Sequence, residues 1–193
     1  MIGVKQNKMV FLKKFPMADI KTKYSDLYLE ERKGLLWPTE FVVRALLGKN
    51  YEFGDSSKAN TALDLGFGDG RNLELLTSLY PSVYGLEISE AICQKASARF
   101  PDVKFLTGYS HDIASADSSF DLVLAAHSIY YCDFSRIEEN FEEVNRVLSK
   151  SGRFVFSILK RDSYLVANSK LLEDDYVRVL GDPLGVRNGS LLK

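Results

Sequence analysis

The sequence contains little cysteine and little histidine, with two of each among its 193 residues. The cysteines, Cys93 and Cys132, are too few for a disulfide framework, and two histidines beside them do not assemble a zinc cluster. We therefore expect no disulfide and no metal ion. Cysteines that stay reduced are typical of cytoplasmic proteins, so a cytoplasmic location is predicted.

Long apolar runs are also absent, and the excess of one charge over the other is small. The longest uninterrupted aliphatic run, Leu122 to Ala126, is far shorter than the roughly 18–20 residues of a membrane-spanning helix. Because 25 basic side chains stand against 26 acidic ones, the formal charge is -1 and no basic field attracts nucleic acid. We expect a soluble protein without membrane insertion and without a nucleic-acid partner.

The length and the hydrophobic content of 46% suit one globular domain with a buried core. Between residues 61 and 160, short apolar runs alternate with segments of helical period, which is typical of βα units and a parallel sheet. The first and fourth runs are apolar enough to be buried on both faces. The predicted strands are Thr61–Gly66, Ser82–Glu87, Val103–Gly108, Phe120–Ala126 and Arg153–Ile158.

Helix signals flank these strands. A capping-box pattern at Ser135–Glu138 begins a predicted helix that ends at Ser151–Gly152, and Pro38 begins another that ends at Gly48. We predict a single domain with a three-layer, Rossmann-like, doubly wound and mostly parallel α/β fold. Its expected parts are a helical cap over residues 1–50, a βα core over residues 61–160 and a tail over residues 161–193.

The segment from Ala62 to Asn72 indicates a ligand site. An apolar strand leads into glycines at positions 66, 68 and 70, and a helix follows. Glycine lets the backbone turn tightly and brings a ligand against the unpaired N–H groups of the helix N-terminus. A dinucleotide fingerprint would require a third glycine at position 71, where Arg71 stands, so a nicotinamide or flavin dinucleotide is disfavoured.

A carboxylate, Glu87, ends the second predicted strand 21 positions after Gly66. In a doubly wound sheet, the carboxyl end of that strand lies beside the turn after the first strand. Glu87 can therefore accept two hydrogen bonds from a ribose diol. Together, the glycine turn and this acid predict a nucleoside site.

These residues resemble motifs of the class I S-adenosylmethionine-dependent methyltransferases, and most closely those of the broad group related to quinone-biosynthesis methylases. Asp64–Gly70 is similar to the first motif of that family, and Glu87 to its ribose-binding acid. Phe120–Val123 is similar to its fourth strand, and Leu148–Phe154 to the turn before its fifth. The resemblance covers about residues 37–160. It implies S-adenosyl-L-methionine as cofactor, S-adenosyl-L-homocysteine as product and a small-molecule methyl acceptor.

The resemblance also implies roles for individual residues. The backbone from Gly66 to Gly68 would hold the amino-acid part of the cofactor, with Asp64 near its ammonium group. Glu87 would bind the ribose, and Ile88 would pack on the adenine. The predicted cofactor-binding residues are Trp37, Asp64, Gly66, Phe67, Gly68, Gly70, Arg71, Asn72, Glu87, Ile88, Ser110 and His111.

The adenine contact is the place where the sequence departs from the family. After the third strand the family often has an acidic residue followed by a polar one, whereas this sequence has Tyr109-Ser110-His111-Asp112. We predict Ser110 and His111 as the contacts. The alternative is that Tyr109 packs beneath a helix that follows.

The acceptor side is predicted after the fourth strand, where the methyl group would point. His127, Tyr130 and Tyr131 lie there, and we predict His127 and Tyr131 as catalytic residues, with packing as the alternative role of His127. A general base is needed only if the nucleophile of the acceptor still carries a proton.

Aromatic residues near the N-terminus have two candidate roles. Trp37, Tyr24 and Tyr28 either close over the cofactor or pack the cap against the sheet. For the two tyrosines we predict packing.

The tail carries weaker signals. It predicts a helix from about Ser163 to Leu172, a short strand over Tyr176–Leu180 and a turn over Gly181–Gly185. The family fold adds a helix and an antiparallel strand pair after the fifth strand, which need roughly 37 residues where 33 remain. We therefore expect an incomplete strand pair, through a shortened chain or a sheet edge that another molecule completes.

The leading functional prediction is an enzyme that methylates a small molecule. The Asn/Asp-Pro-Pro signature of the family for nucleobase amino groups is absent, which disfavours adenine or cytosine N-methylation. The alternative is a module of the same fold that binds the cofactor or another nucleoside without turnover. A dinucleotide-dependent oxidoreductase is disfavoured by Arg71 and by the absence of a Tyr-x-x-x-Lys pair.

Overall fold

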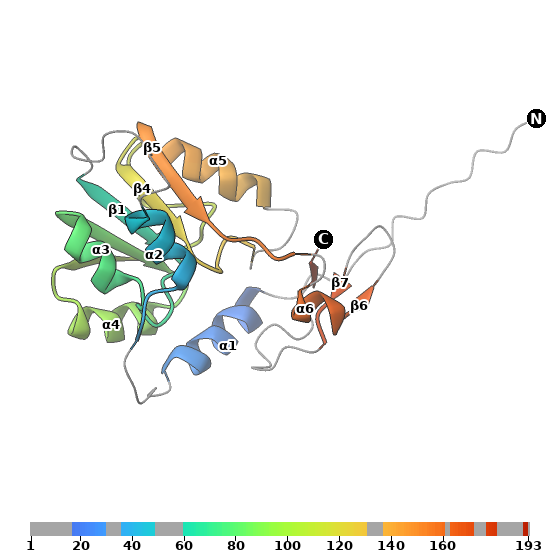
Figure 1. Ribbon diagram of the computed structural model, residues 1–193. Coiled ribbons are helices and arrows are strands. Elements are labelled where there is room, and N and C mark those ends of the chain that lie inside the picture. The colour runs from blue at the N-terminus through green and yellow to red at the C-terminus, as the bar shows by residue number, and fades with distance from the viewer. Residues whose placement is uncertain are drawn as a thin grey trace, which may run out of the picture.

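The computed structural model describes residues 17–29, 36–48, 60–130, 137–160, 163–171, 177–180 and 191–192. A parallel sheet of five strands lies at its centre, in the order β3-β2-β1-β4-β5 (Figure 1). The strands are β1 (Thr61–Leu65), β2 (Ser82–Glu87), β3 (Val103–Thr107), β4 (Phe120–Ala125) and β5 (Leu148–Phe156). The predicted doubly wound α/β fold is confirmed, and all five predicted strands are present.

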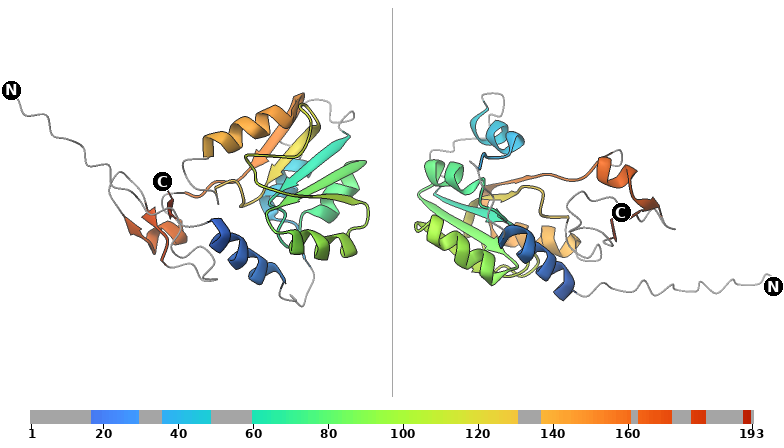
Figure 2. Two further views of the ribbon diagram at one scale, coloured as in Figure 1. Left: turned by 180° about the vertical axis from the view of Figure 1, so that it is seen from behind. Right: turned by 90° about the horizontal axis from the view of Figure 1, so that it is seen from below.

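Helices cover both faces of this sheet (Figures 1 and 2). One face carries α2 (Glu40–Leu47), α3 (Leu73–Leu79) and α4 (Glu90–Arg99), and the other carries α5 (Ile137–Val147). The first helix, α1 (Met17–Leu29), packs along α4. None of the helices in the described part of the chain is both long enough and apolar enough to cross a membrane.

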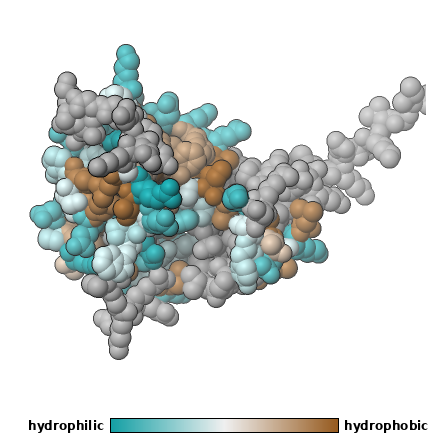
Figure 3. All heavy atoms as spheres, in the orientation of Figure 1, coloured by the Kyte–Doolittle hydropathy of each residue, from teal (hydrophilic) through white to brown (hydrophobic). Residues whose placement is uncertain are grey.

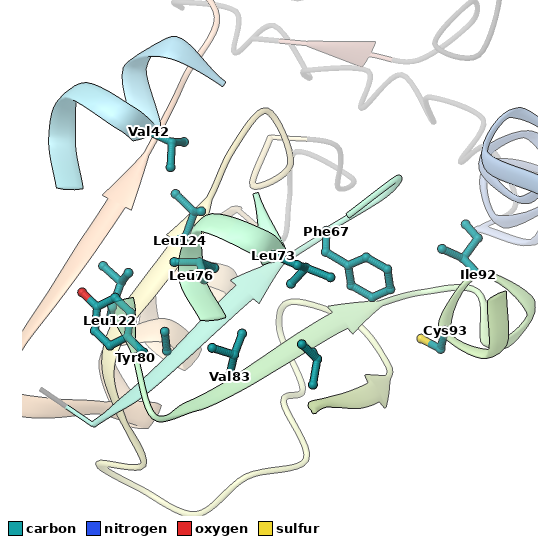
Figure 4. Close-up of a cluster of buried hydrophobic side chains, with 12 residues drawn as sticks. Val42, Phe67, Leu73, Leu76, Tyr80, Val83, Ile92, Cys93, Leu122 and Leu124 are labelled. Carbon is teal, nitrogen blue, oxygen red and sulfur yellow. The ribbon is translucent and has the colours of Figure 1, made fainter. Parts of the chain in front are cut away.

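Side chains of the central strands alternate between two core clusters, as the two-residue period of a strand requires. Leu122 and Leu124 of β4 pack with α2, α3 and α4, whereas Val123 packs with α5. Figure 4 shows Val42 of α2 pointing toward Leu124 in the first cluster. Burial on both faces explains the apolar residues of β1 and β4, in which only Thr61, Asp64 and Asp121 are polar.

The surface mixes polar and apolar side chains. On the face seen in Figure 3, apolar residues form separate patches between hydrophilic ones. Scattered apolar residues are ordinary on protein surfaces. The large apolar side chains that are most exposed are Trp37, Ile158, Tyr164 and Leu171.

The predicted end of the helix before β5 is wrong. The helix ends at Val147, and Leu148 already pairs with Phe120 in the sheet. The register then moves so that Arg153 pairs with Leu122. Leu148 continues the apolar period of the helix, but it belongs to the sheet, and its side chain packs against the core cluster on that face.

The predicted start of α2 is also wrong. Pro38 is not the first helical residue, because α2 begins at Glu40 after Thr39 in an extended conformation. The N–H and hydroxyl of Thr39 both donate to Oδ1 of Asn72, which holds Thr39 outside the helix. Gly48 ends the helix as predicted.

The C-terminal elements form a separate small sheet. The predicted helix over 163–172 is reduced to α6 (Tyr164–Ala167), which Ser163 caps by accepting from the N–H of Val166. Three two-residue strands follow and pair with one another in the order β6-β7-β8, antiparallel. They are β6 (Lys170–Leu171), β7 (Val177–Arg178) and β8 (Leu191–Leu192). Within the described residues, none of these strands extends the five-stranded sheet, and the turn predicted at 181–185 lies outside them.

Candidate functional site

The turn after β1 requires glycine at three of its positions. Gly66, Gly68 and Gly70 have φ angles of 72°, 56° and 77°, which lie in the left-handed region. A Cβ on Gly66 would lie 2.5 Å from Cβ of Ser128, and a Cβ on Gly68 would lie 2.9 Å from the ring of Tyr28. Side chains of the same chain therefore already pack directly against the backbone of this turn, and only glycine leaves room for them.

Asp64 places a buried carboxyl beneath the turn. Its exposed fraction is 1%, and neither carboxylate oxygen accepts a hydrogen bond from the described residues. Burial, together with the nearby charges of Glu87 and Asp69, raises the pKa of Asp64 to about 8. A buried carboxyl without a donor is costly unless a ligand supplies one, so the position favours a ligand with a cationic donor.

Glu87 connects the end of β2 to the glycine turn. Its Oε2 accepts from the N–H of Gly68 over 3.2 Å, and its Oε1 accepts from the N–H of Ile88 over 2.8 Å. Burial raises the pKa of Glu87, while the two N–H donors act in the opposite direction. Each oxygen has a further lone pair for a hydroxyl donor, as two ribose hydroxyls would require.

The side chains of Arg71 and Asn72 stabilise the turn itself. Arg71 forms a fork on Asp69, with Nε 2.9 Å from Oδ1 and Nη2 2.5 Å from Oδ2. Asn72 is buried and accepts from Thr39, which connects the turn to α2. The cofactor contact predicted for both residues stays a prediction.

The loop after β3 lies beside Glu87, because Gly108 donates its N–H to the carbonyl of Glu87 over 3.0 Å. The ring of His111 stacks on Tyr109 with centroids 5.2 Å apart. No helix follows Tyr109, since residues 108–119 are described and form turns and bends. The alternative that Tyr109 packs beneath a helix is therefore wrong, and the contacts predicted for Ser110 and His111 stay predictions.

Tyr28, one of the aromatic residues named from the sequence, lies in this region. Its ring lies against Gly68 and stacks with Tyr24, with centroids 6.2 Å apart. Lys95 of α4 donates to the carbonyls of Tyr28 and Leu29 over 3.1 and 3.0 Å, which holds α1 in place. The four-residue spacing of the two tyrosines puts them on one helical face, which was the available sequence signal. Both rings pack, Tyr28 against the turn and Tyr24 against Tyr28, and the closure of these residues over the cofactor stays a prediction.

The side chain of Trp37 is more exposed than those of the two tyrosines. It precedes α2, and 73% of its surface is exposed. Its predicted cofactor contact stays a prediction.

His127 and Ser157 meet at the neighbouring strand ends. The backbone N–H of His127 donates to Oγ of Ser157 over 2.8 Å, and Nδ1 of the ring lies 3.2 Å from the same oxygen. Tyr130 places its hydroxyl 3.4 Å from Nδ1. Sequence reasoning missed Ser157, which lay inside the predicted strand Arg153–Ile158, whereas the structure ends β5 one residue before it. Tyr131, the other predicted catalytic residue, lies outside the described residues.

Comparison with known proteins agrees with this geometry. Residues 63–156 match the family model described as a methyltransferase domain. Demethylmenaquinone methyltransferase of Thermotoga maritima is 33% identical over 95 residues, which are 48% of this chain and 41% of that protein. Phthiotriol/phenolphthiotriol dimycocerosates methyltransferase of Mycobacterium tuberculosis is 32% identical over 111 residues, which are 54% of this chain and 40% of that protein.

Solved structures share the fold. The PH0226 protein from Pyrococcus horikoshii OT3 superposes with a TM-score of 0.51 at 28% identity, over 60% of this chain and 56% of that one. The chain spans about two fifths of the length of the curated relatives it matches. The matched region runs from the middle of β1 to the end of β5 and includes the glycine turn. This chain therefore contains a class I S-adenosylmethionine-dependent methyltransferase domain.

Proposed function

We propose that this chain binds S-adenosylmethionine at the glycine turn and transfers its methyl group to a small-molecule acceptor. The observation that carries the proposal is the buried carboxyl of Asp64, which accepts no hydrogen bond from the described residues. The amino-acid part of the cofactor ends in an ammonium group. That group would supply both the donors and the positive charge that this carboxyl needs.

The surrounding residues fit the remaining parts of the cofactor. The backbone from Gly66 to Gly70 would lie along the amino-acid part, since its left-handed glycines carry no side chain of their own that would keep a ligand from the backbone. Glu87 would accept the ribose hydroxyls, and Ile88, which is half-buried beside it, would pack on the adenine.

When bound, S-adenosylmethionine supplies an electrophilic methyl group on a positively charged sulfur. The contribution of the protein is to align a nucleophile with that carbon and to exclude water, and such alignment can lower a barrier by roughly 7–11 kcal/mol. The strand ends of β1 and β4 form the topological switch point of this sheet. An acceptor would therefore lie beside His127, which follows β4.

The names of the relatives support a small-molecule acceptor. One is named for demethylmenaquinone, and the other for phthiotriol and phenolphthiotriol dimycocerosates. Neither name is that of a protein or a nucleic acid. We extend only this shared class of acceptor to the present chain.

Calorimetric titration with S-adenosylmethionine and with S-adenosylhomocysteine tests the proposal, with NAD as the control ligand. We expect micromolar binding of the first two and no binding of NAD. Glu87→Ala should weaken binding at least tenfold, because about 1.5–3 kcal/mol is lost with each hydrogen bond to a charged group. Glu74→Ala, on the exposed side of α3, is the matched control and should bind normally. A folded wild-type chain that binds neither compound would overturn the proposal.

A further inference from the structure

The carboxyl ends of β4 and β5 bring together a histidine and two hydroxyl groups that the glycine turn and Glu87 do not use. His127 comes two residues after β4, and Ser157 comes directly after β5. The N–H of Ser157 donates to the carbonyl of Ala125 over 3.2 Å, while the N–H of His127 donates to Oγ of Ser157 over 2.8 Å. These two hydrogen bonds thus connect the end of β4 to the end of β5 next to His127.

The ring of His127 is held from several sides. Nδ1 lies 3.2 Å from Oγ of Ser157 and 3.4 Å from the hydroxyl of Tyr130. Phe41 of α2 meets the ring edge-on, with centroids 5.7 Å apart and planes at 81°. The φ angle of His127 is 58°, a left-handed value that a residue with a side chain adopts only where its surroundings impose it.

The neighbour of His127 lies directly against the glycine turn. The hydroxyl of Ser128 donates to the carbonyl of Leu65, and its Cβ fills the space beside Gly66. His127 is therefore the chain neighbour of a residue that contacts the turn that would bind the cofactor. It stands at the switch point of the sheet, on the side where β4 and β5 end.

We propose that His127 accepts the proton of the methyl acceptor at Nε2, and that Ser157 is a positioning residue that keeps the other ring proton on Nδ1. The inference rests on the proposed function. The acceptor class is a phenol or amine whose nucleophilic atom still carries a proton at neutral pH. As the electron pair of that atom bonds to the methyl carbon, the carbon–sulfur bond breaks, its electron pair stays on sulfur and the proton passes to Nε2.

Ser157 is suited to this role because its hydroxyl oxygen has two lone pairs. One accepts the backbone N–H of His127, and the second faces Nδ1. An acceptor at Nδ1 places the lone pair of the neutral ring on Nε2, where a proton can be taken up. The same contact stabilises the imidazolium that forms after the transfer.

The tautomer of His127 can be measured without any acceptor. The chain has two histidines, so His111→Gln leaves one ring, and long-range nitrogen–proton correlation spectra of the labelled full chain report which nitrogen carries the proton. We expect the proton on Nδ1. Ser157→Ala should shift the population toward the Nε2–H form by roughly tenfold, the value of one hydrogen bond, whereas Ser157→Thr keeps the hydroxyl and should restore the distribution. Two results would overturn the inference: a proton on Nε2 of His127 while Ser157 is present, or a tautomer distribution that Ser157→Ala leaves unchanged.

Turnover with a panel of phenols and amines gives the second measurement. His127→Asn should lower kcat by about 10²–10⁴-fold without weakening S-adenosylmethionine binding, which is the loss expected for a general base. Ser157→Ala should lower kcat by roughly tenfold at unchanged KM. Normal binding with unchanged kcat in His127→Asn would overturn this inference alone. Failure of the wild-type chain to bind the cofactor would overturn the proposed function instead, and this inference with it.

Discussion

Asp64 couples the stability of the empty domain to pH. Its pKa is about 8 in the folded chain against an ordinary value of 3.8, chiefly because burial disfavours the charged form. Protonation therefore favours the folded state. This contribution to stability is complete below about pH 4 and is lost as the pH rises through the folded pKa.

Asp64→Asn, which keeps the shape of the side chain and cannot ionise, should remove this dependence. Relative to the variant, we expect the wild-type free energy of unfolding to fall by up to about 1.4 kcal/mol per pH unit between roughly pH 5 and pH 8. Urea unfolding across that range measures it. Asp102→Asn, at an exposed position, is the control and should follow the wild type. Parallel curves for wild type and Asp64→Asn would show that the carboxyl is already ionised in the empty site.

At the scale of elements, the connection between α2 and the glycine turn depends on one buried side chain. Oδ1 of Asn72 accepts the N–H of Thr39 over 3.0 Å and its hydroxyl over 3.3 Å. Those two donors precede the first turn of α2, whose Val42 is fully buried in the core. Asn72 therefore sets where α2 begins as well as how the turn is closed.

Asn72→Ala should lower the free energy of unfolding by about 1–3 kcal/mol, because it leaves the part-buried donors of Thr39 without their acceptor. Chemical denaturation measures the loss, and proteolysis should become faster around α2. Asn145→Ala, on the exposed side of α5, is the matched control and should change stability by less than about 0.5 kcal/mol. Equal stability of the two variants would mean that the contact with Thr39 contributes nothing.

At the scale of the whole molecule, the site joins α1 to the sheet. Tyr28 lies on Gly68, Gly68 donates to Glu87, and Ser25 donates to the hydroxyl of Ser89 over 2.7 Å. A ligand at the glycine turn would therefore contact or displace α1. We expect S-adenosylhomocysteine to change the hydrogen exchange of α1 together with that of the turn, while α5 remains as it was.

Tyr28→Ala should abolish the change in α1 and leave the change at the turn. Mass spectrometry of amide exchange with and without the compound measures both. Tyr164→Ala removes an exposed tyrosine of α6 and serves as the control. An α1 that responds equally in Tyr28→Ala would show that Tyr28 does not transmit binding.

Local signals were sufficient for much of this arrangement. The apolar runs predicted β1 to β4 to within one residue at each end, because short runs of apolar, β-branched and aromatic residues are typical of strands. The three glycines and the spacing to Glu87 predicted a turn beside a carboxylate. Both features are local in sequence, and topology alone brings them together.

The missed features depend on contacts between distant segments. Ser157 becomes informative only once β4 and β5 are neighbours. Tyr28 was named from the sequence, but its contact with Gly68 exists only once α1 lies on the turn. Leu148 was predicted to lie in a helix because it continues the helical period of apolar residues, but in the structure it pairs with Phe120 in the sheet. Such choices are made by tertiary packing rather than by propensity.

The central place of β1 also has a consequence for the order of folding. β1 pairs with β2, which follows it after one short helix, and with β4, which comes much later in the chain. Nearby pairs close small loops and form early, whereas distant pairs must first overcome a larger loss of chain entropy. We therefore expect β1, β2 and β3 to assemble first and β4 and β5 to dock afterwards. Gly66 belongs to the part that assembles first, and Ser128, which packs against it, belongs to the part that docks afterwards. A chain in which β4 and β5 have not docked therefore lacks a complete site, and ligand binding reports that folding is finished.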